Sequence, residues 1–334
     1  MRRSHPNVDR FTHEHLVYRW KQAGRLAAAV LLGIACAPAA SRAPQADQAP
    51  VEAGLWDAHT HLSYYGEAAL DSLLAHGVVA VRDCGGDALE LRRWRDEIAA
   101  GKRKGPRIYF SGPVIDGPKD ARYRLTLTSP YQARAAVDSL ASLGVDFIKT
   151  HNALPRAAYF AVLREAKRRG LKVASHVPRG VPAWEAADSG ASSIEHAAES
   201  MVASPIYAGF ATDVDQAIAW WRSPAGDSAI AHLARIGVAL TPTLVAYRAG
   251  ALRQHSPQMR EDRLRVLEFL KELTGRMHRA GVPILAGSDF ATPLPLLAPG
   301  RSLREELELL VESGLTRKEA LAAATSNPRE WFNR

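Results

Sequence analysis

Residues 54–62 read GLWDAHTHL, an apolar, β-rich run that ends in two histidines separated by one residue. A polar turn and the stretch EAALDSLLAHG follow it, and this stretch has the apolar spacing of an amphipathic helix and ends in glycine. The same unit, an apolar run followed by a helical stretch, recurs along the rest of the chain. The further candidate strands are GVVAVRDCG (77–85), RIYFSGPVI (107–115), VDFIKTH (145–151), KVASHV (172–177), SSIEHA (192–197), GVALTPTLV (237–245) and VPILAGSDF (282–290).

Eight such units predict an α/β fold in which the strands close into a (β/α)8 TIM barrel, a fold that typically takes about 250 residues. A doubly wound open sheet is the alternative, but no Gly-rich phosphate-binding turn follows the first strand. Glycines between a helical stretch and the next strand are expected to form left-handed helix ends. They are the glycines at positions 77, 144, 170, 190, 237 and 281.

The composition indicates a folded globular protein with a sizeable core, since 47% of the 334 residues are hydrophobic. The formal net charge is +8, but much of the excess lies in the first 42 residues and on mixed helix faces such as RRWRDE. No compact basic patch is interleaved with aromatic residues, so we predict that the protein does not bind nucleic acid. The oligomeric state is left open.

The first fifty residues differ from the rest in composition. Arg19, Lys21 and Arg25 precede the apolar run LAAAVLLGIACA, and small residues and the polar stretch SRAPQADQAP follow. This order is typical of a secretory signal peptide with a short linker, and the run is shorter than the roughly 20 residues of a membrane span. We therefore expect a signal peptide and linker over 1–50, a barrel over 51–334, and an exported protein, periplasmic or extracellular.

The chain has two cysteines, Cys36 and Cys84. Cys36 ends the apolar run, where a bacterial lipoprotein carries its acylated cysteine, although Gly33 stands where Leu is usual. A lipid anchor at Cys36 is therefore an alternative to a freely exported form. With Cys36 removed or acylated, Cys84 has no partner, and we expect no structural disulfide.

Residues able to bind a metal recur where the candidate strands end. His59 and His61 are two positions apart, so on a strand both imidazoles point to the same side, with Asp57 placed to support them from beneath. Lys149 ends an apolar run, His176 and His196 end two further strands, and Asp289 ends the last one. Each has an ordinary interpretation: surface histidines, a lysine reaching to solvent, a core histidine, or a helix N-cap.

Together the six residues support one site, because the carboxyl ends of the strands converge on one mouth of a closed barrel. Four imidazoles with two oxygen donors suit zinc or another borderline divalent ion, and their number is enough for two ions. The oxygen donor at Lys149 would be a carbamate, since a desolvated lysine with a lowered pKa can react with carbon dioxide.

At these residues the chain resembles the amidohydrolase superfamily, whose binuclear members carry HxH on strand one, carboxylated Lys on strand four, His on strands five and six, and Asp on strand eight. The strings DFIKTHN, GLKVASHV, LTPTLVAYR and LTRKEALAAATSNP look similar to its imidazolonepropionase-like branch, which includes prolidase-like dipeptidases. Relatives usually add a small β-sandwich. This chain lacks the segments that would form it, so we predict that the sandwich is largely absent.

The resemblance implies a metal-dependent hydrolase that cleaves an amide or peptide C–N bond. His59, His61 and Asp289 would hold the more buried ion and His176 and His196 the more exposed one, with carboxylated Lys149 and a hydroxide bridging them. Asp289 and His196 are the candidate catalytic residues, and Asp289 would carry the proton to the leaving amine.

Substrate selection is expected to come from the loops at the mouth. Arg122 and Tyr123 follow the third candidate strand and Tyr247 and Arg248 the seventh, so each pair could bind the carboxylate of a small-molecule or dipeptide substrate, or simply face solvent. His151 is interpreted as a surface residue or a residue behind the ligands. Two alternatives stay open: a lactonase, esterase or organophosphate hydrolase with the same site, and a truncated barrel without activity.

Overall fold

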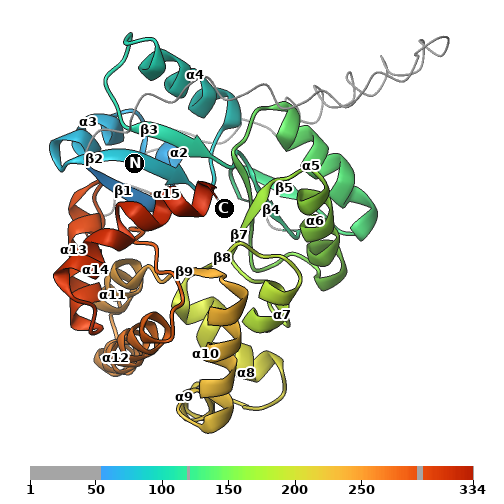
Figure 1. Cartoon of the computed structure of the whole chain (residues 1–334), viewed down its shortest axis with the longest axis vertical. Helices are drawn as coiled ribbons and strands as arrows, with labels where there is room; N and C mark the ends of the chain where they lie inside the picture. The colour runs from blue at the N-terminus through green and yellow to red at the C-terminus, as the bar shows by residue number, and fades with distance from the viewer. Residues whose placement is uncertain (1–53, 119–120, 292–295, 334) are drawn as a thin grey trace, which may run out of the picture. The chain divides into compact units, whose positions relative to one another are not determined.

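The structure, a computed structural model, describes residues 54–118, 121–291 and 296–333. Short parallel strands alternate with helices that surround them (Figure 1). The strands are β1 (Leu55–Thr60), β2 (Val78–Asp83), β3 (Arg107–Phe110), β4 (Val114–Asp116), β5 (Arg124–Thr126), β6 (Phe147–Thr150), β7 (Lys172–Ser175), β8 (Ser193–Glu195) and β9 (Ala239–Thr241).

Several helices have the capping residues that mark their ends. The Asp87 side chain accepts hydrogen bonds from two backbone N–H groups at the start of α4, and all six glycines expected at helix ends have positive φ. The larger helices are α3 (Ala68–Ala75), α4 (Ala88–Ala99), α5 (Ala133–Ser142), α6 (Arg156–Arg168), α9 (Val214–Trp221), α10 (Pro224–Ile236), α11 (Leu244–Leu252), α12 (Pro257–Arg279), α13 (Arg301–Glu312) and α15 (Ser326–Asn333). Shorter ones are α2 (Leu62–Tyr65), α7 (Ala183–Asp188), α8 (Ser204–Tyr207), α14 (Arg317–Ala323), the 3₁₀ helix η2 (Pro130–Gln132) and the π-helical η3 (Ala197–Val202).

The third predicted strand is broken in the middle. It divides at Gly112, whose φ is 66°, into β3, which pairs with β2, and β4, which pairs with β6. The sheet therefore passes from β1, β2 and β3 to β4, β6, β7, β8 and β9 through one bent strand. An additional strand that the sequence did not predict, β5, pairs with β4 at the edge.

The eighth predicted strand, 282–290, forms isolated bridges rather than a continuous ladder. Ile284 bridges to Leu240 of β9, and Phe290 bridges to Thr60 of β1. Between these bridges the N–H of Ala58 donates to the carbonyl of Ala286 at 2.8 Å. This segment thus lies between β9 and β1, and the strands form the (β/α)8 barrel. Pro283 has no N–H to contribute to a ladder, which is one reason for the irregular pairing.

Helix α15 lies across the strands in Figure 1, and its aromatic residues pack against residues at the amino-terminal ends of the strands. The Phe332 ring stacks on Tyr109 with centroids 4.4 Å apart, and the Trp331 ring meets Phe147 edge-on at 5.8 Å. Trp56, at the start of β1, also packs against Phe332. This end of the barrel is filled by side chains, so the chemistry must use the opposite end.

Gly275 of α12 tests how closely the outer helices pack. A Cβ at Gly275 would lie 1.9 Å from the carbonyl oxygen of Ser313, so Gly275→Ala should lower the free energy of unfolding by about 1–3 kcal/mol. Gly250 in α11 is the matched control: its Cβ would meet nothing closer than Arg263 at 3.6 Å, and Gly250→Ala should raise stability by about 0.5–1 kcal/mol. Denaturant titration measures both, and a Gly275→Ala variant as stable as the parent would contradict this packing.

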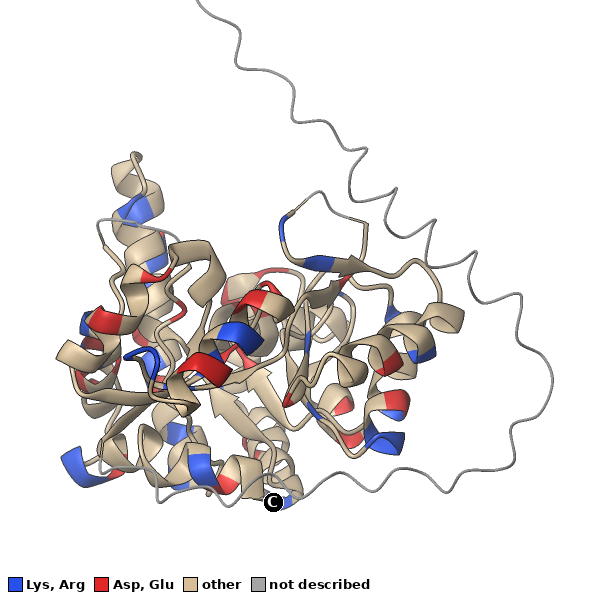
Figure 2. Ribbon diagram, turned by 90° about the horizontal axis from the view of Figure 1, so that it is seen from above, with Lys and Arg blue, Asp and Glu red and all other residues tan. Residues whose placement is uncertain are grey.

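Acidic and basic residues are interspersed over the outer helices (Figure 2), where many form ion pairs such as Arg168–Asp138. Among the helices that the structure describes, none is long and apolar enough to cross a membrane. Cys84 is a buried free thiol. The predicted signal peptide and Cys36 lie outside the described residues.

Candidate metal centre

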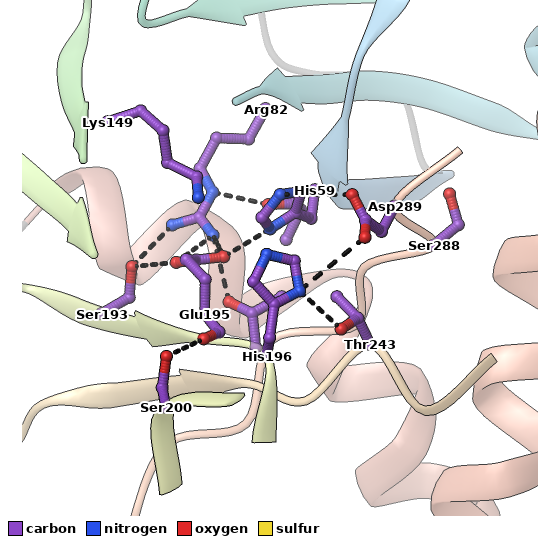
Figure 3. Close-up of polar contacts among 12 residues, drawn as sticks. His59, Arg82, Lys149, Ser193, Glu195, His196, Ser200, Thr243, Ser288 and Asp289 are labelled. Atoms are coloured by element: carbon purple, nitrogen blue, oxygen red, sulfur yellow. Dashed lines mark hydrogen bonds and ion pairs between the residues drawn. The ribbon is translucent and has the colours of Figure 1, made fainter. Parts of the chain in front are cut away.

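The six predicted ligands lie at or just beyond the carboxyl ends of their strands. Figure 3 labels four of them, His59, Lys149, His196 and Asp289. His59 belongs to β1 and His61 directly follows it, while Lys149 belongs to β6. The remaining three lie just beyond β7, beyond β8 and at the end of the eighth strand segment; they are His176, His196 and Asp289. The His59 ring centroid is 4.7 Å from that of His196, which is 4.6 Å from that of His176.

Asp289 is surrounded by imidazole nitrogens. Its Oδ1 lies 3.2 Å from Nε2 of His61 and 3.6 Å from Nε2 of His59, and its Oδ2 lies 3.8 Å from Nδ1 of His196. Burial alone would raise the pKa of this carboxyl group, but the imidazoles outweigh it and hold the pKa below its ordinary value. Asp289 is therefore an anion in the centre of the cluster.

The hydrogen bonds of the Nδ1 atoms of His61 and His59 indicate the protonation state of the Nε2 atoms that face Asp289. Nδ1 of His61 donates to the Gly85 carbonyl at 3.1 Å, and Nδ1 of His59 donates to the Glu195 carboxylate at 2.7 Å. Burial opposes protonation of His61, but its hydrogen bond with Asp289 raises its pKa, so a proton can lie between His61 Nε2 and Asp289. Neutral His59 presents the lone pair of Nε2 toward the same Asp289 oxygen, and a lone pair and an anion repel each other unless a proton or a metal cation lies between them.

Unpaired buried nitrogens point to a metal rather than a proton. Among the described residues, His59 Nε2 and both ring nitrogens of His176 are buried without a hydrogen-bond partner, an arrangement that is costly unless another group binds there. Burial lowers the pKa of His59 to about 4 and also lowers the pKa values of His176 and His196. Neutral imidazoles are the form that binds divalent cations. Donor atoms of His59, His196 and Asp289 lie within 4.8 Å of one another, so these residues fit a metal ion.

Lys149 is only 1% exposed, and its Nζ makes a long hydrogen bond, 3.4 Å, to the carbonyl of Thr150. Burial lowers the pKa of its amino group. Its side chain extends toward the cluster in Figure 3. A buried amine with a lowered pKa beside the predicted ligands is compatible with the carbamate that the sequence predicted.

Unusual backbone conformations turn two of these side chains into the site. His196 has a φ of 64° and Asp289 a φ of 54°, values that residues other than glycine rarely adopt. Thr243, with φ 50°, places its hydroxyl 2.9 Å from Nδ1 of His196. Strain of this kind accumulates at functional sites.

Asp57 supports the ligands from beneath, where its position on β1 predicts it. Its carboxyl group accepts hydrogen bonds from the N–H and the hydroxyl of Ser288, at 2.9 and 2.5 Å, and thereby ties β1 to the residue before Asp289. Burial raises its pKa to about 7. Two other supporting residues, Arg82 and Glu195, were missed, although each is a charged residue inside an apolar strand.

The profile of the amidohydrolase family matches residues 51–334. The chain belongs to this family. A bottromycin amidohydrolase has 25% sequence identity and a TM-score of 0.69, over 84% of this chain and 67% of the other. A putative prolidase from Bifidobacterium longum has 28% identity and a TM-score of 0.62, over 84% and 69% of the two chains. An Aspergillus niger ochratoxinase shares the fold at 18% identity and a TM-score of 0.63, over 83% and 71%. No curated protein sequence matches significantly.

These similarities support the prolidase-like branch that the sequence motifs indicated.

In this amidohydrolase the two residue pairs expected to bind substrate differ in their surroundings, and the first pair is Arg122 and Tyr123. Tyr123 reaches the cluster through ring contacts: it meets Tyr64 edge-on at 5.0 Å, and Tyr64 meets His61 at 5.9 Å. The neighbouring Arg122 is exposed, and its carbonyl accepts a hydrogen bond from the Tyr64 hydroxyl.

The segment after the seventh strand was predicted to be a loop, but in the structure it is a helix. β9 ends at Thr241, and α11 begins at Leu244 after only Pro242 and Thr243, so Tyr247 and Arg248 lie on a helix. Arg248 donates to Glu305 at 2.6 Å, and a substrate carboxylate would have to compete with this ion pair.

A further charged group at the mouth of the amidohydrolase was not predicted. Asp116 at the end of β4 accepts a hydrogen bond from Arg124 of β5 at 2.8 Å and lies 3.3 Å from Nδ1 of His151. The His151 ring is 4.4 Å from that of His176. His151 therefore lies behind a predicted ligand, as one of its two interpretations has it, and Arg124 adds a positive charge there.

Proposed function

We propose that this amidohydrolase cleaves an amide or peptide C–N bond in a small substrate, as a dipeptidase of the prolidase kind. The observation that carries the proposal is the convergence of the His59, His61 and His196 imidazoles on the Asp289 carboxylate, with Nε2 of His59 buried and without a hydrogen-bond partner. The 28% identity to a putative prolidase supports the same reaction class.

Two divalent cations, with zinc as the first candidate, fit the donor set. His59, His61 and Asp289 would hold one, and His176 and His196 the other, with N6-carboxylated Lys149 between them. When bound, such ions lower the pKa of water so that hydroxide is available near neutral pH, and they polarise a carbonyl group. The barrel residues supply the donor atoms, the orientation and the proton transfers.

Asp289 is our candidate for proton transfer. It is the carboxylate that the site brings among the three imidazoles of His59, His61 and His196. It would accept the proton of the attacking hydroxide and deliver it to the leaving amine, so that the amine departs neutral. Tyr123 and Arg122 are the first candidates to bind a substrate carboxylate, because their segment reaches the cluster through Tyr64.

We expect purified protein produced with zinc supplementation to contain about two divalent ions per chain, because the donor set exceeds what one tetrahedral zinc requires. Elemental analysis measures this, and His59→Ala is the matched variant that should lose at least one ion. Protein that is folded by circular dichroism yet holds no metal would refute the binuclear site.

A substrate screen tests the bond type separately. Purified metal-loaded protein would be assayed with Xaa-Pro and other dipeptides, N-acyl amino acids, lactones, carboxylic esters and phosphotriesters. Turnover of dipeptides or N-acyl amino acids supports the proposal. Turnover confined to lactones, esters or phosphotriesters would overturn it while leaving the metal centre intact, since hydroxide attacks all of these electrophiles.

A further inference from the structure

A buried ion pair lies directly beneath the predicted metal ligands. Arg82 of β2 is 1% exposed and Glu195 of β8 is fully buried, and Nη2 of Arg82 lies 2.8 and 2.7 Å from the two carboxylate oxygens of Glu195. Nε of Arg82 donates to the Ala58 carbonyl at 2.6 Å, and Nη1 donates to the Ser193 hydroxyl at 2.9 Å. The guanidinium is thus fixed to β1 and β8 at once (Figure 3).

Two aromatic rings, one from α15 and one from β6, pack against the same guanidinium. Its central carbon lies 4.6 Å from the Trp331 ring centroid and 5.6 Å from that of Phe147. A buried ion pair contributes little net stability, because desolvation of both charges offsets their attraction. We therefore expect these Arg82 contacts to have a role other than a contribution to the stability of the fold.

Glu195 in turn orients the ring of His59. Its Oε2 accepts the hydrogen bond from His59 Nδ1 at 2.7 Å, while its Oε1 accepts one from the Ser193 hydroxyl at 2.5 Å. With the proton held at Nδ1, the lone pair of His59 is at Nε2, on the side of Asp289. Carboxylates that accept from a metal-bound histidine orient the ring and fix its tautomer in the same way.

The same residues also form a competing set of donors. Ligand atoms of His59, Cys84 and Glu195 lie within 4.8 Å of one another. We call the side of the His59 ring that faces Glu195 its lower side. A cation bound there through Nδ1 of His59 would displace the hydrogen bond by which Glu195 keeps Nε2 free for the side of Asp289. Arg82 occupies both oxygens of Glu195 and places a positive charge beside this set, which makes it unfavourable for a metal.

We propose that Arg82 and Glu195 are positioning residues that decide which side of His59 binds metal. Glu195 holds the ring with Nε2 toward Asp289, and Arg82 keeps Glu195 from becoming a ligand itself together with Cys84. This inference rests on the proposed metal centre and adds a selection between two donor sets that share one histidine.

The test measures metal affinity rather than turnover. Zn²⁺ dissociation constants would be determined by competition with a chromogenic chelator on full-length variants shown to be folded by circular dichroism. Glu195→Gln leaves Arg82 without its counter-charge and should weaken Zn²⁺ binding by about 10- to 100-fold. Glu306→Gln is the matched control, because Glu306 is a fully buried carboxyl group that accepts from the N–H groups of Leu244 and Val245 rather than from a predicted ligand, and it should keep the parental affinity.

Arg82→Met provides an independent readout. With Glu195 released, Co²⁺ should bind on the lower side, and the Cys84 thiolate should give a charge-transfer absorption in the near ultraviolet that the parent lacks. The double variant Arg82→Met/Cys84→Ser should lose that absorption. If Arg82→Met or Glu195→Gln does not fold, Arg82→Lys, which keeps the charge without the fork of donors, should still weaken Zn²⁺ binding.

The outcomes separate this inference from the metal centre itself. A parent that binds no Zn²⁺ refutes the centre. A parent that binds Zn²⁺, with folded Glu195→Gln or Arg82→Lys variants within about twofold of its affinity, refutes only the positioning role. Variants that are less stable but keep the parental affinity also refute it, because they assign the pair to stability alone.

Discussion

Asp289→Asn should lower kcat by about 10²- to 10⁴-fold while KM stays within a few-fold of the parent. The amide can still offer an oxygen to a cation, but it cannot accept a proton from hydroxide. Asp289 lies 3.2 Å from His61 and 3.6 Å from His59, so the substitution removes a negative charge at the centre of the cluster. Asn has nearly the same shape as Asp, so the packing around it should change little.

Metal content must be measured on the same preparation, because the loss of the negative charge also weakens a bound cation. The comparison is therefore made at metal concentrations that give equal occupancy in parent and variant. An Asp289→Asn variant that retains both ions and hydrolyses a good substrate at the parental rate would exclude Asp289 as the proton carrier.

Lys149→Ala should reduce kcat/KM by at least about 100-fold and lower the metal content from about two ions per chain. The reason is that the variant would lose the proposed anionic bridge, and two cations close together would then repel each other without compensation. Because Lys149 is only 1% exposed, its truncation leaves a cavity where the proposed bridge would lie.

That cavity gives a test of the bridge itself. Added acetate or propionate should enter it and restore part of the activity of Lys149→Ala. Lys149→Met fills the cavity with an uncharged chain and should not respond to carboxylates. Parental activity in either variant would show that Lys149 is not part of the site, and equal rescue of both would show that carboxylates act elsewhere.

The sequence predicted the barrel and the gathering of the six ligand positions because both depend on local patterns. Alternation of apolar runs with amphipathic helices fixes the order of the elements, and in a closed barrel every strand end faces the same mouth. His176 and His196 could therefore be placed near each other without any knowledge of their contacts. The bend at Gly112 was not predictable, since it depends on how β3 and β4 pair with different neighbours.

Pairings between distant residues were also beyond the sequence. Arg82 and Glu195 are 113 residues apart, and each alone has the appearance of an isolated charge in an apolar strand. Likewise, the position of Tyr247 on α11 follows from the early end of β9 at Thr241, which pattern reasoning extended to residue 245. These features depend on packing between elements rather than on the spacing within one of them.

The positive φ angles of His196, Thr243 and Asp289 set a limit on how stable this barrel can be. Each such residue costs on the order of 1–3 kcal/mol relative to a relaxed backbone, a large amount beside the net stability of a typical domain. Glycine would relieve the strain at any of the three, yet it would remove an imidazole, a hydroxyl or a carboxylate from the cluster. Selection for thermal stability alone would therefore favour sequences that abandon the site, and activity and robustness are opposed at these positions.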